Sequence, residues 1–178
     1  MNRVIAYTDG SAVVKGKAKG HGGFGTYFPD LYGSKAAFSL GFKTTKTGRM
    51  ELSALYYAIT AIRIDSAVEL VIYSDSEYVV KAFTLGRLKK WIDAGWKNTS
   101  GEVKNKDMWK AVKYELDIRP LMTLEMIHIR SHQVEKQKDP TKKKQLMKDP
   151  NIIGNMIADR LADHKRHTEL LETDKLYQ

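Results

Sequence analysis

Four acidic side chains stand in apolar stretches of the sequence, where a buried charge is costly unless a positive group meets it. Asp9 and Asp75 each follow a short, β-rich apolar run. Glu51 lies on the core-facing row of a helical pattern, and Asp159 lies among apolar residues of another. Four ionised carboxylates near one end of a sheet would repel one another, and divalent cations relieve such repulsion. Because Mg²⁺ prefers oxygen ligands and shares phosphate oxygens with its sites, the set indicates metal-assisted chemistry on a phosphodiester.

Each carboxylate taken alone also has a structural explanation, and the sequence leaves these alternatives open. Asp9 precedes a glycine, as turn residues often do. Glu51 could cap a helix, and Asp75 could be a helix N-cap. Asp159 could pair with the arginine that follows it or with Arg49. It is the combination of four acids that favours a metal site.

The periodicity of apolar residues predicts the elements that must position these side chains. Short β-rich runs predict strands at residues 4–8, 24–32, 36–42, 69–73 and 124–129. Spacings of three to four predict helices at residues 48–65, 76–85, 107–116 and 153–165. Residues 15–25 and 131–151 are expected to be loops, and a turn is expected near residues 29–30 or 32–33. This order predicts an α/β fold, in which helices flank a mixed five-stranded sheet of an antiparallel meander plus parallel strands.

The composition is that of a globular protein: 42% of the 178 residues are hydrophobic and 29% are charged. The absence of cysteine excludes disulfides, zinc–thiolate sites and a cysteine nucleophile. No apolar run approaches the roughly 18–20 residues of a membrane helix. No signal peptide is recognised at the start of the chain, so we expect a cytoplasmic protein that does not bind membranes.

The positive charge is concentrated in one part of the chain. Residues 87–148 hold 16 basic and 8 acidic residues, which accounts for most of the net charge of +9. Such a concentration indicates a polyanionic partner, most often nucleic acid. A solvated basic surface is the alternative that charge alone leaves open.

Six short motifs resemble those of type 1 ribonucleases H, in the order found in that family, from about residue 4 to residue 162. They are Thr8-Asp9-Gly10-Ser11, Arg49-Met50-Glu51-Leu52, Ser74-Asp75-Ser76, Val103-Lys104-Asn105 with Met108-Trp109, Ile129-Arg130-Ser131-His132, and Asn155 with Asp159 and Ala162. The resemblance implies an endonuclease that hydrolyses the RNA strand of RNA–DNA hybrids, leaving 5′-phosphate and 3′-hydroxyl ends with low sequence specificity.

The resemblance also implies roles for the acidic residues. Asp9, Glu51, Asp75 and Asp159 would hold two Mg²⁺ ions, with Mn²⁺ as an alternative. Asp9 would bridge both ions, Glu51 and Asp75 would hold one, and Asp159 the other. A monomer without a small-molecule cofactor is expected.

Further residues match the family's proton-transfer and substrate-binding positions. His132 matches a mobile-loop histidine that helps to move protons or release product, and Asn155 matches a residue near the metal site. The matches to nucleic-acid contacts are Lys15, Lys89, Lys90, Trp91, Trp96, Lys97 and Asn105. The two tryptophans could equally be the core of a small helical hairpin, and the two asparagines could be helix caps. Lys15, Gly48 and Glu77 depart from the usual family residues, which affects the RNA contacts and not the carboxylates.

We expect residues 1–166 to form the catalytic domain, with a basic protrusion at about 86–104 and an extended lysine-rich loop at about 133–151. Residues 167–178 are expected to be a polar tail that frays. The loop's lysines should add non-specific phosphate affinity; a solubilising loop is the alternative. Two other functions stay open: a related nuclease such as a junction resolvase or integrase core, and a non-catalytic hybrid-binding module.

Overall fold

The computed structural model describes residues 2–13, 20–166 and 172–173. The strands within these residues are β1 (Asn2–Ala12), β2 (Gly20–Leu31), β3 (Ser34–Thr45), β4 (Val68–Ser74), β5 (Lys97–Asn98), β6 (Gly101–Glu102) and β7 (Thr123–His128). The helices are α1 (Thr47–Thr60), α2 (Glu77–Thr84), α3 (Arg87–Asp93), α4 (Lys106–Asp117), α5 (Gln133–Lys136), α6 (Pro140–Leu146) and α7 (Pro150–Arg166).

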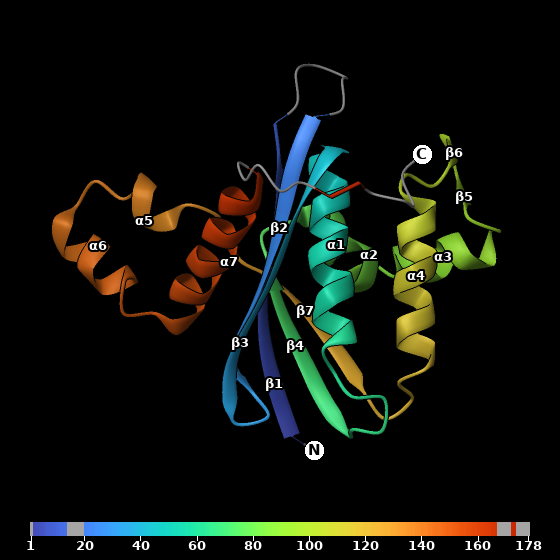
Figure 1. Ribbon diagram of the computed structural model, residues 1–178, viewed down its shortest axis with the longest axis horizontal. Helices are drawn as coiled ribbons and strands as arrows, with labels where there is room; N and C mark the ends of the chain where they lie inside the picture. The colour runs from blue at the N-terminus through green and yellow to red at the C-terminus, as the bar shows by residue number, and fades with distance from the viewer. Residues whose placement is uncertain (1, 14–19, 167–171, 174–178) are drawn as a thin grey trace.

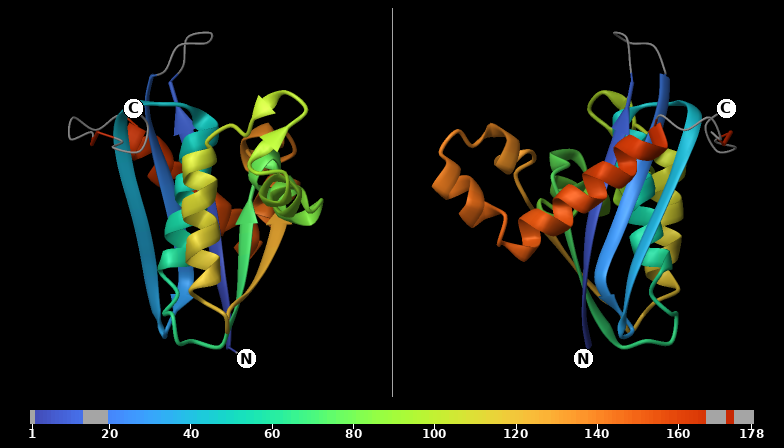
Figure 2. Two further views of the ribbon diagram at one scale, coloured as in Figure 1. Left: turned by 90° about the vertical axis from the view of Figure 1, so that its right-hand side faces the viewer. Right: turned by 60° about the vertical axis from the view of Figure 1, so that its left-hand side comes forward.

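The main sheet has five strands in the order β3-β2-β1-β4-β7. β1, β2 and β3 pair antiparallel, whereas β4 pairs parallel with both β1 and β7. The predicted fold is therefore confirmed: a mixed sheet made of a meander and parallel strands, flanked by helices. Figures 1 and 2 show α1 on one face of the sheet with α4 beside it, and α7 crossing the other face. Coverage on both faces explains why β4 reads as a continuous apolar run.

The first two strands are longer than predicted. β1 does not end before Asp9 but continues to Ala12, because β2 pairs with it over this whole length. β2 begins at Gly20, inside the stretch that was expected to be a loop. The hairpin turns at Tyr32 and Gly33, whose φ angles of 53° and 86° are those of a two-residue turn that matches the strand twist.

The lysine-rich segment is not the irregular loop that was expected, because it contains α5 and α6, and α7 begins at Pro150. Two Asp-Pro pairs start helices here. The Asp139 carboxylate accepts hydrogen bonds from the N–H groups of residues 141 and 142, and the Asp149 carboxylate accepts one from Asn151. Proline is well suited to the first helical position because its missing N–H has no partner there anyway. An apolar face is absent from α6, so periodicity could not predict it.

The described part of the C-terminal tail is attached to the edge strand, contrary to the expectation that the tail frays. Glu172 forms a parallel bridge with Phe42 of β3. Its N–H donates to the Gly41 carbonyl at 2.7 Å, and its carbonyl accepts from the Lys43 N–H at 3.0 Å. These bonds satisfy backbone groups that an open sheet edge would expose.

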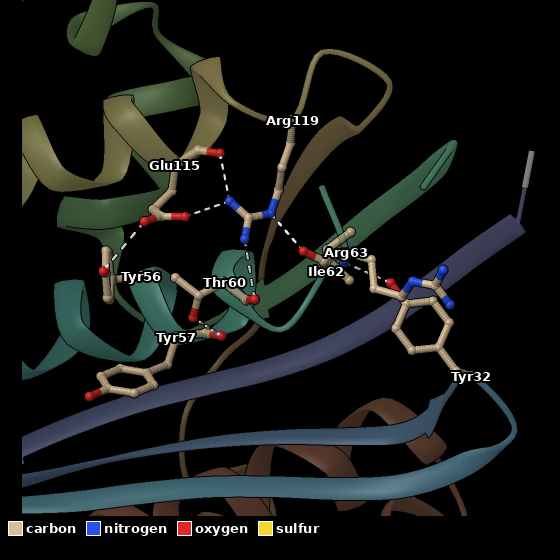
Figure 3. Close-up of polar contacts among 8 residues, drawn as sticks. All are labelled: Tyr32, Tyr56, Tyr57, Thr60, Ile62, Arg63, Glu115 and Arg119. Atoms are coloured by element: carbon tan, nitrogen blue, oxygen red, sulfur yellow. Dashed lines mark hydrogen bonds and ion pairs between the residues drawn. The ribbon is translucent and has the colours of Figure 1, made fainter. Parts of the chain in front are cut away.

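A buried arginine joins the ends of α1 and α4 (Figure 3). Arg119 is only 5% exposed and donates to the carbonyl oxygens of Ile62 at 2.7 Å and Thr60 at 3.3 Å. It also forms an ion pair with Glu115, whose carboxylate lies 3.5 Å from the Tyr56 hydroxyl. Arg119 thereby holds the first residues of the loop between α1 and β4 against the end of α4.

Candidate active site

The strand register places Asp9 and Asp75 side by side. Thr8 of β1 is the partner of Ser74 of β4, and Ser74 is the partner of His128 of β7. Asp9 and Asp75 are the next residues on their strands, where the parallel pairing stops. The carboxyl ends of such strands are where open α/β sheets bind ligands.

Two glycines let helices approach the sheet closely enough to bring in the other two acids. A Cβ on Gly10 would lie 2.1 Å from the backbone nitrogen of Glu51, so the start of α1 rests directly on β1. A Cβ on Gly25, which pairs with Asp9 across β1 and β2, would lie 2.3 Å from the carbonyl oxygen of Ala158. This contact sets α7 against the sheet one residue before Asp159.

The electrostatic state of Asp9 shows that the acids interact. Asp9 is 8% exposed, and its burial raises its pKa well above the ordinary value of 3.8. The negative charges of Asp75 and Asp159 raise it further, as does a hydrogen bond with Asp75, while the backbone of Gly10 opposes the shift. A group of carboxylates this close favours a bound proton or a cation.

Glu51 and Asp159 belong to the same group. Burial raises the pKa of Glu51, the hydroxyl of Ser76 lowers it by hydrogen bonding, and the charge of Asp75 raises it. Burial also raises the pKa of Asp159, His132 opposes this, and the charges of Asp163 and Asp75 add to it. Ser76 is a member that the sequence did not indicate beyond a capping role, because its bond to Glu51 crosses from α2 to α1.

The structural alternatives for the acids can now be compared with their surroundings. The N-cap of α2 is Ser76, whose hydroxyl oxygen accepts from the Val79 N–H, so Asp75 does not cap that helix. Glu51 lies inside α1, whose N-cap is Lys46. Arg49 is fully buried and makes a two-fold ion pair with Asp107, at 2.7 and 3.0 Å. The capping roles considered for Asp75 and Glu51 are therefore taken by other residues, and the guanidinium of Arg49 is paired with Asp107.

The donor set suits a hard divalent cation, since it consists of carboxylate oxygens at a partly buried sheet edge. Among the residues that the structure describes, no three acidic or histidine side chains lie so that together they could hold a metal ion. The assignment of metal ligands therefore stays a prediction.

His132 and Asn155 lie between Asp75 and Asp159 along the chain. His132 is exposed, has a left-handed φ of 54°, and is close enough to Asp159 to affect its pKa. Asn155 is one turn before Asp159 on α7 and is only 5% exposed. Its side-chain oxygen has no hydrogen-bond partner among the described residues, although buried amides normally have one. Both residues therefore have polar groups that a substrate could engage.

The candidate nucleic-acid contacts fall into two groups, apart from Lys15, which lies outside the described residues. Lys89, Lys90 and Lys97 are exposed on α3 and β5. Trp91 and Trp96 are partly buried and pack against the main core, with the Trp91 ring 5.5 Å from that of Trp109. The tryptophans thus hold the protrusion on the body of the protein, and the lysines are left facing solvent.

Asn105 lies in a cavity of about 520 Å³ that also reaches Glu51. Its lining includes Lys46, Lys104 and Glu51. The Tyr78 hydroxyl closes one side, where it donates to the Lys104 carbonyl and accepts from the Trp109 indole at 2.7 Å. Lys46 and Lys104 thus line the same cavity as Glu51, a candidate metal ligand.

The RNase H family profile matches residues 1–167 of the chain. The chain belongs to the ribonuclease H family. Among its relatives in this family, ribonuclease H of Lachnoclostridium phytofermentans is 42% identical over 124 residues, covering 65% of this chain and 76% of that protein. Ribonuclease H of Rippkaea orientalis is 30% identical over 178 residues, covering 99% and 93%.

The fold also resembles solved structures of ribonuclease H domains. The structure of the foamy viral protease-reverse transcriptase in complex with RNA/DNA hybrid matches with a TM-score of 0.70 and 19% sequence identity. The match covers 92% of this chain and 20% of that much longer chain. At this identity, the likeness shows a shared fold. Among the described residues, no helix is long and apolar enough to span a membrane.

Proposed function

We propose that this protein is an endonuclease that hydrolyses the RNA strand of RNA–DNA hybrids. Low sequence specificity and 5′-phosphate and 3′-hydroxyl products are part of the proposal. The observation that carries it is the coupling of Asp9 with Asp75 and Asp159 at one sheet edge, in a member of the ribonuclease H family. The foamy viral structure on this fold, which contains an RNA/DNA hybrid, supports the choice of substrate.

In the proposed mechanism, Asp9, Glu51, Asp75 and Asp159 hold two Mg²⁺ ions, or Mn²⁺ in their place. When bound, the ions supply an activated water and stabilise the leaving 3′ oxygen. Asp9 would be one of these ligands: its burial and the charges of Asp75 and Asp159 raise its pKa, so a bound cation would favour its ionised form. The Ser76 hydroxyl orients Glu51 by donating to its carboxylate.

His132 moves protons in this proposal. It is exposed at the end of the connection from β7 and lies near Asp159. Histidine is the side chain best suited to exchange protons near neutral pH. It would take a proton from the reacting water or assist release of the cleaved strand.

Substrate binding is proposed to use the backbone of the hybrid. Lys89, Lys90 and Lys97 contact phosphates from the protrusion, and Asn105 contacts one in the cavity beside Glu51. Such contacts position a duplex without reading its bases, so the enzyme should be nearly indifferent to sequence. RNA is distinguished from DNA by contacts to 2′-hydroxyl groups across the minor groove.

The experiment that tests this function compares duplexes of one sequence in Mg²⁺: an RNA–DNA hybrid, an RNA duplex and a DNA duplex. We expect cutting of the RNA strand of the hybrid alone. Cutting of the DNA duplex would replace the proposal with a resolvase-like nuclease. Binding of the hybrid without cutting, in either Mg²⁺ or Mn²⁺, would replace it with a hybrid-binding module.

A further inference from the structure

Residues 133–149, here called the lysine arm, project from the body of the protein. Figures 1 and 2 show α5 and α6 standing away from the sheet, on the opposite side of the molecule from α3. Helix α6 buries none of its side chains, and Val134 is the one buried residue of the arm. Helical stability in proteins comes mostly from packing an apolar face, so core packing does not account for this arm.

The arm's charges are arranged differently from those of the other helices. It carries six lysines: Lys136, Lys138, Lys142, Lys143, Lys144 and Lys148. On α2, α3 and α4 several lysines pair with an acid one helical turn away, as in Lys81–Glu77, Lys89–Asp93 and Lys113–Asp117. None of the six arm lysines has an ion pair with any residue that the structure describes. A helix that serves only as a solvated surface gains stability from such pairs, whereas this one leaves its charge available.

A groove connects the arm to the candidate active site. Its volume is about 580 Å³, and it is lined by Asp75 and His128 at the sheet edge and by Lys136, Gln137 and Leu146 on the arm, with Arg130 between them. The remaining acid of the lining, Glu77, is paired with Lys81. The volume lies within the range of about 300–1,000 Å³ that is usual for ligand sites. The groove therefore places two basic side chains, Arg130 and Lys136, between Asp75 and the rest of the arm.

We propose that the lysine arm and this groove bind the sugar–phosphate backbone of the substrate on one side of the cleavage site. The proposal rests on the proposed function for the identity of the substrate. The unpaired lysines supply the phosphate contacts, and Arg130 and Lys136 continue them toward Asp75. The arm thus acts as a second basic contact, on the side of the molecule away from the α3 protrusion.

The first test measures how hybrid binding depends on salt. The variant Lys142→Gln/Lys143→Gln/Lys144→Gln is compared with Lys35→Gln/Lys43→Gln/Lys110→Gln, which removes the same charge from exposed positions on β3 and α4. Each phosphate contact in duplex nucleic acid contributes about 0.9 to the slope of log K against log salt. We therefore expect the arm variant to flatten the slope by about 2–3, and the control variant to leave it unchanged.

Cleavage kinetics and hybrid length complete the test. The arm variant should raise KM and leave kcat unchanged, because the lysines do not touch the reacting atoms. Removing base pairs from the end of the hybrid that reaches the arm should abolish the difference in KM between the parent and the arm variant. Removing them from the other end should preserve this difference.

A salt slope and a KM equal to those of the control variant would overturn the proposal. The binding measurement needs no catalysis, so it decides the role of the arm even if the parent fails to cleave the hybrid. Failure of cleavage alone would contradict the proposed function and leave the arm's result intact.

Discussion

Asp9 is the residue at which burial and repulsion act together. It is nearly covered, faces Asp75 and Asp159, and has a raised pKa because of burial first and these two charges second. A carboxyl group with a higher pKa in the folded than in the unfolded state binds its proton more tightly when folded. Folding stability therefore falls as pH rises from about 4 through the raised pKa.

Asp9→Asn should stabilise the metal-free protein at neutral pH, because it removes a carboxyl group whose ionisation is opposed in the folded protein by burial and by Asp75 and Asp159. Each tenfold increase in the proton affinity of a carboxylate on folding corresponds to about 1.4 kcal/mol, or about 3–6 °C in Tm for a protein of this size. The gain should disappear near pH 4, where the parent carboxyl is protonated as well. Thermal unfolding in a chelator at both pH values checks this prediction; a lower Tm for the variant at neutral pH would contradict it.

The sequence predicted the acids of the site better than their neighbours. Asp9 and Asp75 were recognisable because each directly follows a short apolar, β-rich run in the sequence, although only Asp75 lies past the end of its strand. The bond from Ser76 to Glu51 could not be predicted, since it depends on how α2 and α1 lie against each other. The same holds for the unpaired oxygen of Asn155, because its burial comes from the packing of α7.

At the scale of elements, the contact between β1 and α1 sets the position of Glu51. Gly10→Ala would place a Cβ about 2.1 Å from the Glu51 nitrogen, so α1 must shift. Overpacking of this kind costs about 1–3 kcal/mol, and a displaced Glu51 should lower kcat much more than it changes KM. Gly86→Asn is a suitable control, because Gly86 has open space around it and asparagine tolerates its φ of 61°. Full activity of Gly10→Ala would show that α1 does not position the site.

The Arg119 cluster should contribute to stability and not to catalysis. Arg119→Met leaves the carbonyl oxygens of Ile62 and Thr60 and the Glu115 carboxylate without their donor. Breaking a buried pair in this way costs about 3–5 kcal/mol, so we expect Tm to fall by roughly 6–20 °C. Lys113→Gln, which breaks an exposed pair on the same helix, should cost less than about 1 kcal/mol. Equal Tm losses in the two variants would contradict this account.

The sequence indicated the elements with clear apolar periodicity and missed those without it. Strands β4 and β7 and helices α1, α4 and α7 were expected, because each buries a regular apolar face. The extension of β1 past Asp9 was missed because the glycines around it read as turn signals. Gly10 and Gly25 leave no room for a side chain, because α1 packs directly on the first and α7 on the second. Helix α6 was missed because lysines follow its Asp-Pro start, so the sequence shows no apolar periodicity there.

At the scale of the whole molecule, the exposed lysines of α3 and β5 and those of the lysine arm belong to segments that lie on opposite sides of the sheet (Figure 1). Asp9 and Asp75 lie where the parallel pairing of β1 and β4 stops, and the groove lined by Asp75 leads from there to the lysine arm. Such an arrangement fits a duplex held by its backbone across the edge, with the carboxylates at one phosphodiester. The concentration of charge in residues 87–148 predicted a polyanionic partner, and the protrusion and the lysine-rich loop were expected as separate segments, but their positions on opposite sides of the molecule required the fold.

The most direct test of this account follows both strands of a labelled RNA–DNA hybrid in Mg²⁺, with the parent, Asp75→Asn and, as a control for an exposed acid, Asp65→Asn. The account predicts RNA-strand fragments with 5′-phosphate ends for the parent and Asp65→Asn, an intact DNA strand, and loss of cleavage for Asp75→Asn. Parental activity in Asp75→Asn, or cutting of the DNA strand, would contradict the central claim that these carboxylates hydrolyse the RNA of a hybrid.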